Sequence, residues 1–180
     1  MATSYYSVDA ILTDSQKAPC TFDLSVPHLT ALNNGSGIEN GMKLELPLWM
    51  ADMLALSKPA GPSSSSLVSL DMPAALGPRV INALKADPKS VDVKAQARWF
   101  YGLGERMLDL FDEEEMMEVL NDTFKQRALE IADKAANTRT TQQGGDEFLR
   151  GLDENERRLF RAAHNGTNDV KKWFDSSSRA

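Results

Sequence analysis

A strand that turns at a proline directly into an apolar helix is the feature that most constrains how this chain folds. Leu44 and Leu46 alternate with charged neighbours at the two-residue period of a strand, and Pro47 follows at once. Proline is tolerated at the start of a helix because its missing N–H would be unpaired there anyway. Residues 48–56 are almost all apolar. We therefore expect a small β unit that is joined rigidly to a helix.

The composition is that of an ordinary globular protein. The chain has 180 residues, of which 42% are hydrophobic and 26% are charged, which is enough for one domain or two small ones. Its 20 Lys and Arg against 26 Asp and Glu give a net charge of −6. Because a phosphate backbone attracts basic surfaces, we expect no direct sequence-specific DNA binding by this chain.

Targeting signals and disulfides are not indicated. Cys20 is the single cysteine, so no internal disulfide framework is possible, and a reducing compartment is favoured. The first residues lack a basic segment followed by an apolar one, and no apolar run reaches the ~20 residues that a membrane helix needs. We expect a soluble nuclear or cytosolic protein with no membrane association.

The patterns predict an α+β fold that is mainly α, with two domains. Residues 1–71 are expected to form a small β-rich domain and residues 72–180 a larger α-helical bundle. Strand patterns cover residues 21–26, 43–46 and 67–70, residues 33–41 read as a turn-rich loop, and residues 57–66 read as a flexible surface loop. Helical patterns cover residues 72–87, 97–110 and 113–137, followed by a final helix that Asp146 could cap and that Asn165 and Gly166 could bend.

The third helical pattern, residues 113–137, carries an apolar face that shifts along its length. One stripe contains Met117, Leu120, Phe124, Ala128, Ile131 and Ala135. Other apolar residues widen the stripe on one side early and on the opposite side late. Such a helix needs different neighbours at its two ends, which favours contacts beyond the chain itself.

The sequence offers few candidates for chemistry. Cys20 and His28 could form a thiol and imidazole pair, so a small intracellular thiol enzyme stays open as an alternative, although neither residue lies in a known nucleophile motif. No Cys or His spacing matches a metal site. We expect no catalytic, cofactor-binding or metal-binding residues.

Two charged segments have structural explanations. The acidic run at residues 112–115 suits the first turn of a helix, where carboxylates face unpaired N–H groups. The basic residues of the last helix are expected to form a solvated face with pairs such as Asp153 with Arg157.

Large apolar residues are numerous for a helical part of this size, and aromatic and Met-rich surfaces are typical of protein interfaces. An interaction subunit is therefore favoured, with a free-standing helical adaptor as a further alternative. The residues that we expect to pack within the bundle or against partners are Leu46, Pro47, Trp49, Trp99, Phe100, Tyr101, Leu103, Met107, Leu110, Met116, Leu120 and Phe124.

Several segments together resemble one known family. They are YYSVDAILTDSQKAPCTF at residues 5–22, KLELPLWMA at 43–51, ADP at 86–88, WFYGLGERML at 99–108, LDENERRLF at 152–160 and NDVKKWF at 168–174. In this order they resemble the third partner-of-Sld-five subunits of the eukaryotic GINS complex, a heterotetramer of chromosomal DNA replication.

The resemblance implies a non-catalytic scaffold subunit in the nucleus, with no ATP site, metal or other cofactor. Its implied partners are three sister GINS subunits. Through the complex, the implied partners also include the MCM helicase ring, its Cdc partner and the leading-strand polymerase. The complex would join the MCM ring and the Cdc partner in the active replicative helicase, at initiation and at the moving replication fork.

Overall fold

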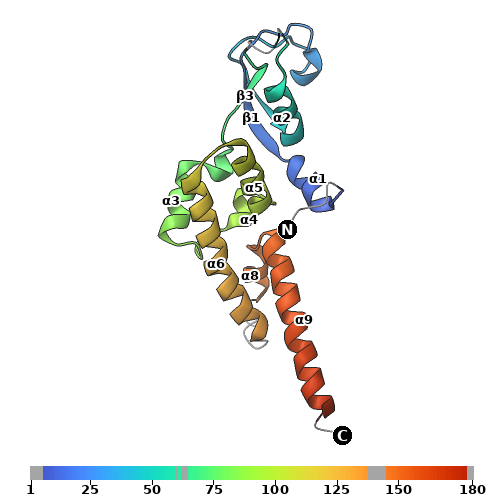
Figure 1. Cartoon of the computed structure of the whole chain (residues 1–180), viewed down its shortest axis with the longest axis vertical. Coiled ribbons are helices and arrows are strands. Elements are labelled where there is room, and N and C mark those ends of the chain that lie inside the picture. The colour runs from blue at the N-terminus through green and yellow to red at the C-terminus, as the bar shows by residue number, and fades with distance from the viewer. Residues whose placement is uncertain (1–5, 60, 62–64, 138–144, 178–180) are drawn as a thin grey trace. The chain divides into compact units, whose positions relative to one another are not determined.

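The computed structural model describes residues 6–59, 61, 65–137 and 145–177. The chain divides into two compact units, Met1–Gly77 and Pro78–Ala180 (Figure 1). The first holds a small antiparallel sheet with short helices, and the second is helical. The predicted α+β, mainly α class is therefore confirmed. The domain boundary expected between residues 71 and 72 stays a prediction.

The sheet of the first unit has three antiparallel strands in the order β2-β1-β3. Its elements are α1 (Val8–Asp14), β1 (Lys17–Phe22), a 3₁₀ turn (Thr30–Leu32), β2 (Lys43–Pro47), α2 (Leu48–Leu56), β3 (Val68–Leu70) and a second 3₁₀ turn (Ala74–Leu76). In the register, Cys20 lies opposite Leu44 on one side and Leu70 on the other. The core of this unit consists of Cys20, Phe22, Ile38, Leu46, Ala51 and Val68.

The predicted join between strand and helix is confirmed. Strand β2 ends at Pro47, and α2 begins at Leu48 with no residue between them. Pro47 has a φ of −55°, close to the value to which its ring is restricted, so the turn costs this residue little backbone entropy. Leu48 and Ala51 of α2 are buried, which holds the helix to the unit.

The first strand is displaced from its predicted position. We expected a strand at residues 21–26, whereas β1 covers Lys17–Phe22. Pro19 in its middle is the reason for the error, because proline cannot donate to a ladder and normally argues against a central strand. The small residues Ala18 and Cys20 take the buried positions of β1. Val26 keeps only an isolated bridge to Ile38.

Helices are the only regular elements among the described residues of the second unit. They are α3 (Pro78–Ala86), α4 (Val93–Gln96), α5 (Phe100–Leu110), α6 (Glu114–Ala136), α8 (Gly145–Arg150) and α9 (Glu154–Ser177). The helices predicted at residues 97–110 and 113–137 are confirmed as α5 and α6 to within a few residues. The helix predicted at residues 72–87 begins later, at Pro78, since residues 74–76 form a 3₁₀ turn instead.

Where the sequence predicted a single final helix, the structure has two helices. The chain leaves helical geometry between Arg150 and Glu154, so α8 and α9 are separate. Asn165 and Gly166 lie within α9 and do not interrupt it, and a bend at these residues stays a prediction. The side chain of Asp146 lies outside the described part of the structure, so its capping role stays a prediction.

Gly104 of α5 lies close to Leu120 of α6, in line with the close packing expected from the glycines of this segment. A Cβ atom added to Gly104 would lie 2.7 Å from Cδ1 of Leu120, nearer than carbon atoms can pack. Helices α6 and α9 pack along each other (Figure 1). Between them lies a core cluster of Ile131, Ala135, Leu152 and Phe160.

Candidate partner interface

Helix α9 begins with a capping box that ties it to α5. The carboxylate of Asp153 accepts a hydrogen bond from the Asn155 N–H at 3.2 Å, while Glu156 accepts one from the Asp153 N–H at 3.1 Å. The same Asp153 carboxylate accepts a bond from the Phe100 N–H at 3.1 Å. Asp153 therefore satisfies unpaired N–H groups at the starts of two helices.

Glu156 is the centre of a buried polar network. Its side chain is fully buried and accepts from Nε and Nη2 of Arg127 at 2.5 and 2.9 Å, and from the Tyr101 hydroxyl at 3.0 Å. Nη1 of Arg127 donates to the carbonyls of Pro88 and Val91 at 3.1 and 3.0 Å. A buried ion pair is tolerated when its hydrogen bonds are satisfied in this way. The network fixes α5, α6 and α9 to one another.

Burial, together with neighbouring charges, shifts the pKa values of Tyr101 and Asp153. Burial raises the pKa of Tyr101 far above its ordinary value, and the negative charge and hydrogen bond of Glu156 raise it further. Burial also raises the pKa of Asp153 from 3.8 to about 6, although the backbone N–H groups that it accepts from oppose the shift. Tyr101 is therefore a neutral donor to Glu156 at any physiological pH.

The raised pKa of Asp153 predicts a pH-dependent stability. The folded state holds a proton that the unfolded state releases between pH 4 and 6, so the contribution of Asp153 to stability falls as pH rises through this window. Relative to Asp153→Asn, the wild type should gain on the order of 2 kcal/mol when the pH falls from 7 to 4.5. Urea unfolding of both proteins at both pH values measures the difference between their free energies of unfolding. A difference that is the same at pH 7 and pH 4.5 would contradict the prediction.

The expected interface residues occupy three kinds of position. Buried ones are Leu46, Trp99, Phe100, Leu103, Met107, Met116 and Leu120, half-buried ones are Pro47, Tyr101 and Leu110, and exposed ones are Trp49 and Phe124. The buried members contribute to the chain's own packing. A role against partners stays a prediction for all of them, and only the exposed pair offers much surface without rearrangement.

The apolar stripe predicted on α6 coincides only in part with the buried face of the helix. Met117 and Phe124 were placed on the stripe but are exposed, whereas Thr123 and Arg127 are buried. The physical reason is the ion pair with Glu156, which draws a charged side chain into the helix interface. A pattern of apolar residues alone could not locate that face.

The exposed end of α9 was not identified from the sequence as a candidate interface. Residues 169–176 are all exposed, and among them Trp173 and Phe174 show 63% and 61% of their surface. Their rings meet edge to face with centroids 4.9 Å apart, and Val170 lies on the same side at helical spacing. Contiguous exposed aromatic surface of this kind marks protein interaction sites. We call Val170, Trp173 and Phe174 the α9 patch.

A second exposed apolar surface lies on the first unit. Helices α1 and α2 contact each other. Their exposed large apolar residues are Val8, Ile11, Leu12, Trp49, Met53 and Leu56. Of these, only Trp49 was among the expected interface residues. The sequence signal for Met53 and Leu56 was an apolar α2 with no polar face, which is more apolar surface than one side of a helix can bury.

Arg158, Arg161, Lys171 and Lys172 of α9 are exposed, as expected of a solvated basic face, but Arg157 makes a different contact from the one predicted. The Arg157 side chain does not form the predicted pair with Asp153. Instead its Nη2 donates to the Leu149 carbonyl at 3.0 Å, because the Asp153 carboxylate is directed at backbone N–H groups. Arg157 thereby caps the end of α8.

The environment of Cys20 does not suit a thiol nucleophile. Its side chain is fully buried, and burial raises the thiol pKa to about 11, whereas His28 is exposed. A catalytic thiol needs a lowered pKa and access to substrate. Among the described residues, no cluster of three or more metal-ligating side chains occurs. No helix in the described ranges is both long and apolar enough to span a membrane.

A labelling experiment tests this interpretation of Cys20. We expect the folded chain to react with a thiol-specific disulfide reagent at pH 8 at least about 100-fold more slowly than the urea-unfolded chain, because little thiolate forms and the sulfur is covered. Equal rates in the two states would revive the thiol-enzyme alternative.

Comparisons with known proteins define the class and then the family. Residues 75–175 match the GINS complex protein helical bundle domain, so the second unit is a GINS-type bundle. Residues 6–56 match the PSF3 N-terminal domain.

Full-length relatives agree with both matches. The chain is 57% identical over 179 residues to the DNA replication complex GINS protein PSF3 of Phaeosphaeria nodorum, covering 98% of this chain and 99% of the relative. It is 55% identical over 178 residues to the protein of that name from Aspergillus fumigatus, with coverage of 98% and 99%. For Schizosaccharomyces pombe the identity is 36% over 174 residues, with coverage of 97% and 99%. The chain belongs to the PSF3 family of GINS proteins.

Proposed function

We propose that this chain is the PSF3 subunit of a heterotetrameric GINS complex in the nucleus and that it works by binding rather than by catalysis. The observation that carries the proposal is the α9 patch on a chain of this family. Relatives of near-equal length are named as proteins of a DNA replication complex, which supports assembly with other GINS subunits.

Exposed aromatic surface favours an obligate assembly over a free adaptor. Burying a side chain such as Trp173 or Phe174 stabilises an assembly by about 1.5–3 kcal/mol relative to leaving it in water. The exposed residues of α1 and α2 add a second surface of the same kind. A monomer with such surfaces tends to aggregate, and sister subunits that cover them would prevent this.

The larger role follows from the family resemblance. The tetramer would hold the MCM ring and its Cdc partner together in the active replicative helicase and would link the helicase to the leading-strand polymerase. In this role the chain contributes rigid surfaces, and the buried network around Glu156 supports the fixed arrangement of helices that such surfaces need.

Coexpression with the three sister subunits tests the proposal. We expect a 1:1:1:1 complex in size-exclusion chromatography with light scattering, and poor solubility of the chain expressed alone. A stable, soluble monomer that does not coelute with the sister subunits would instead support the free-standing adaptor and overturn the proposal.

A further inference from the structure

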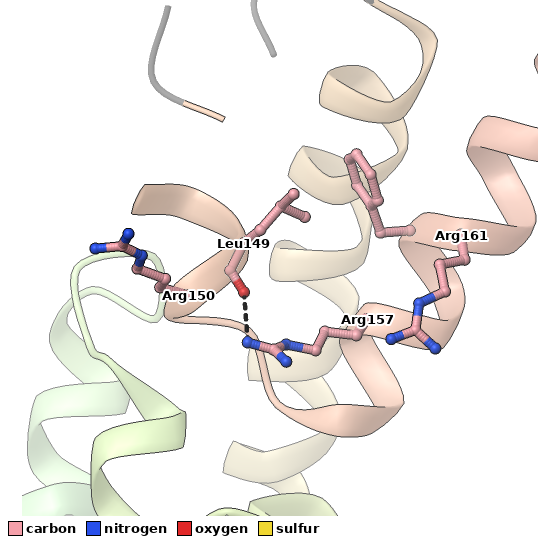
Figure 2. Close-up of a pocket in the computed structure, with 5 residues that line it drawn as sticks. Leu149, Arg150, Arg157 and Arg161 are labelled. Atoms are coloured by element: carbon pink, nitrogen blue, oxygen red, sulfur yellow. Dashed lines mark hydrogen bonds between the residues drawn. The ribbon is translucent and has the colours of Figure 1, made fainter. Parts of the chain in front are cut away.

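A hollow lined with arginines lies between α8 and the first turns of α9. Its volume is about 450 Å³, and its lining residues are Leu149, Arg150, Arg157, Phe160 and Arg161 (Figure 2). Three of the five are cationic and none is acidic. This concentration of positive charge contrasts with the net charge of −6 of the chain.

The described residues neutralise these guanidinium groups only in part. In Figure 2, Arg157 reaches back to the Leu149 carbonyl, to which it donates at 3.0 Å. Its Nε is buried and has no hydrogen-bond acceptor among the described residues. Nη2 of Arg161 lies 3.9 Å from Oε1 of Glu154, at the outer limit of an ion pair, and Arg150 is exposed. The exposed Arg150 and the weakly paired Arg161 therefore favour an incoming anion at this hollow.

In a neighbouring hollow, the positive and negative charges of the lining residues offset one another in part. It holds about 690 Å³ and is lined by both signs of charge, including Lys89, Asp92, Glu130 and Lys134. Lys134 pairs with Glu130 at 2.7 Å within it. Among the described residues, the corresponding contact of the arginine-lined hollow is the longer one between Arg161 and Glu154, so its positive charge is less balanced and favours a negative ligand.

We propose that the arginine-lined hollow binds an acidic segment of a sister subunit, an inference that rests on the proposed function. A carboxylate of that segment pairs with Arg157 and with Arg150 or Arg161, because guanidinium groups match carboxylates in two-point geometry. An adjacent apolar side chain lies on Leu149 and Phe160. An acidic peptide is favoured over nucleic acid because the hollow is small and has the apolar Leu149 and Phe160 in its lining, whereas phosphate backbones need extended basic surfaces.

Carbodiimide coupling in the reconstituted complex tests this inference. The reagent joins a lysine amine to a carboxylate in contact with it and leaves arginine unchanged. Arg150→Lys and Arg161→Lys keep the positive charge, so assembly should proceed normally. We expect at least one of the two introduced lysines to form an isopeptide bond with an Asp or Glu of a sister subunit, at about tenfold or more above the background of the wild-type complex. Arg158→Lys, on α9 but outside the hollow, is the matched control and should not couple to that segment.

The outcomes separate this inference from the proposed function. Normal assembly without the bond, or coupling only to Glu154 of the same chain, overturns the inference and leaves the proposed function intact. Failure of the wild-type chain to assemble overturns both. Protection of the introduced lysines from acetylation by an oligothymidylate strand, with no isopeptide bond, would assign the hollow to phosphate and also overturn the inference.

Discussion

Replacing Glu156 with alanine should lower the free energy of unfolding of the helical unit by about 3–5 kcal/mol. The substitution leaves Arg127 buried without a counter-charge and leaves the Tyr101 hydroxyl without an acceptor. It also removes half of the capping box, because the Asp153 N–H loses its partner. Since each lost bond involves a buried group, water cannot replace them at low cost.

Urea unfolding followed by circular dichroism measures this effect, and two variants sharpen it. Lys125→Ala breaks an exposed pair with Asp122 and should cost no more than about 1 kcal/mol. Arg127→Met combined with Glu156→Leu removes both charges, so it should be less destabilised than the sum of the single variants. If Glu156→Ala lowered the free energy of unfolding no more than Lys125→Ala, the network would not hold the helices together as its geometry indicates.

The helical periodicity of the sequence was sufficient for α5 and α6, because their apolar residues repeat at helical spacing over three turns or more. It was also sufficient for the join at Pro47, where strand and helix patterns meet at one residue. The central strand β1 was misplaced because Pro19 argues against a strand, and only the long-range pairing with β2 and β3 overrides that local signal.

The start of α9 could have been recognised from the sequence. Asp153 and Glu156 have the spacing of a capping box, and Gly151 just before them is a helix-ending residue. The partner of Glu156 could not have been recognised. Arg127 is 29 residues away along the chain, and nothing local distinguishes it from the solvated charges of α6.

The candidate interface was the least predictable part. An apolar residue at helical spacing can face the chain's own core or a partner, and the pattern is the same in both cases. Phe100 and Met107 proved to be fully buried, whereas Trp173, three residues beyond Val170, exposes 63% of its surface. Deciding between the two cases required the tertiary arrangement, in which α6 accompanies α9 only over part of its length (Figure 1).

Removing the aromatic residues of the α9 patch should weaken assembly with the sister subunits by about 100-fold or more, because buried aromatic residues dominate interface energies and each contributes 2 kcal/mol or more when it is a hot spot. The double variant Trp173→Ala with Phe174→Ala tests this. Both side chains are exposed in the free chain, so the variant should keep its helicity and become more soluble when expressed alone.

Competition in the reconstituted complex measures the loss, with tagged wild-type and variant chains competing for a limiting amount of the sister subunits. Lys171→Ala with Lys172→Ala is the matched control, since it changes two exposed residues of the same helical turn without removing apolar surface. The one described ion pair that it breaks joins Lys172 to Asp169 on the surface and should contribute little. If the lysine control competed for the sister subunits as weakly as the aromatic variant, the end of α9 would bind through charge or helix formation. If the aromatic variant competed as well as the wild type, the α9 patch would face solvent in the complex. The apolar surface of α1 and α2 would then have to carry the assembly.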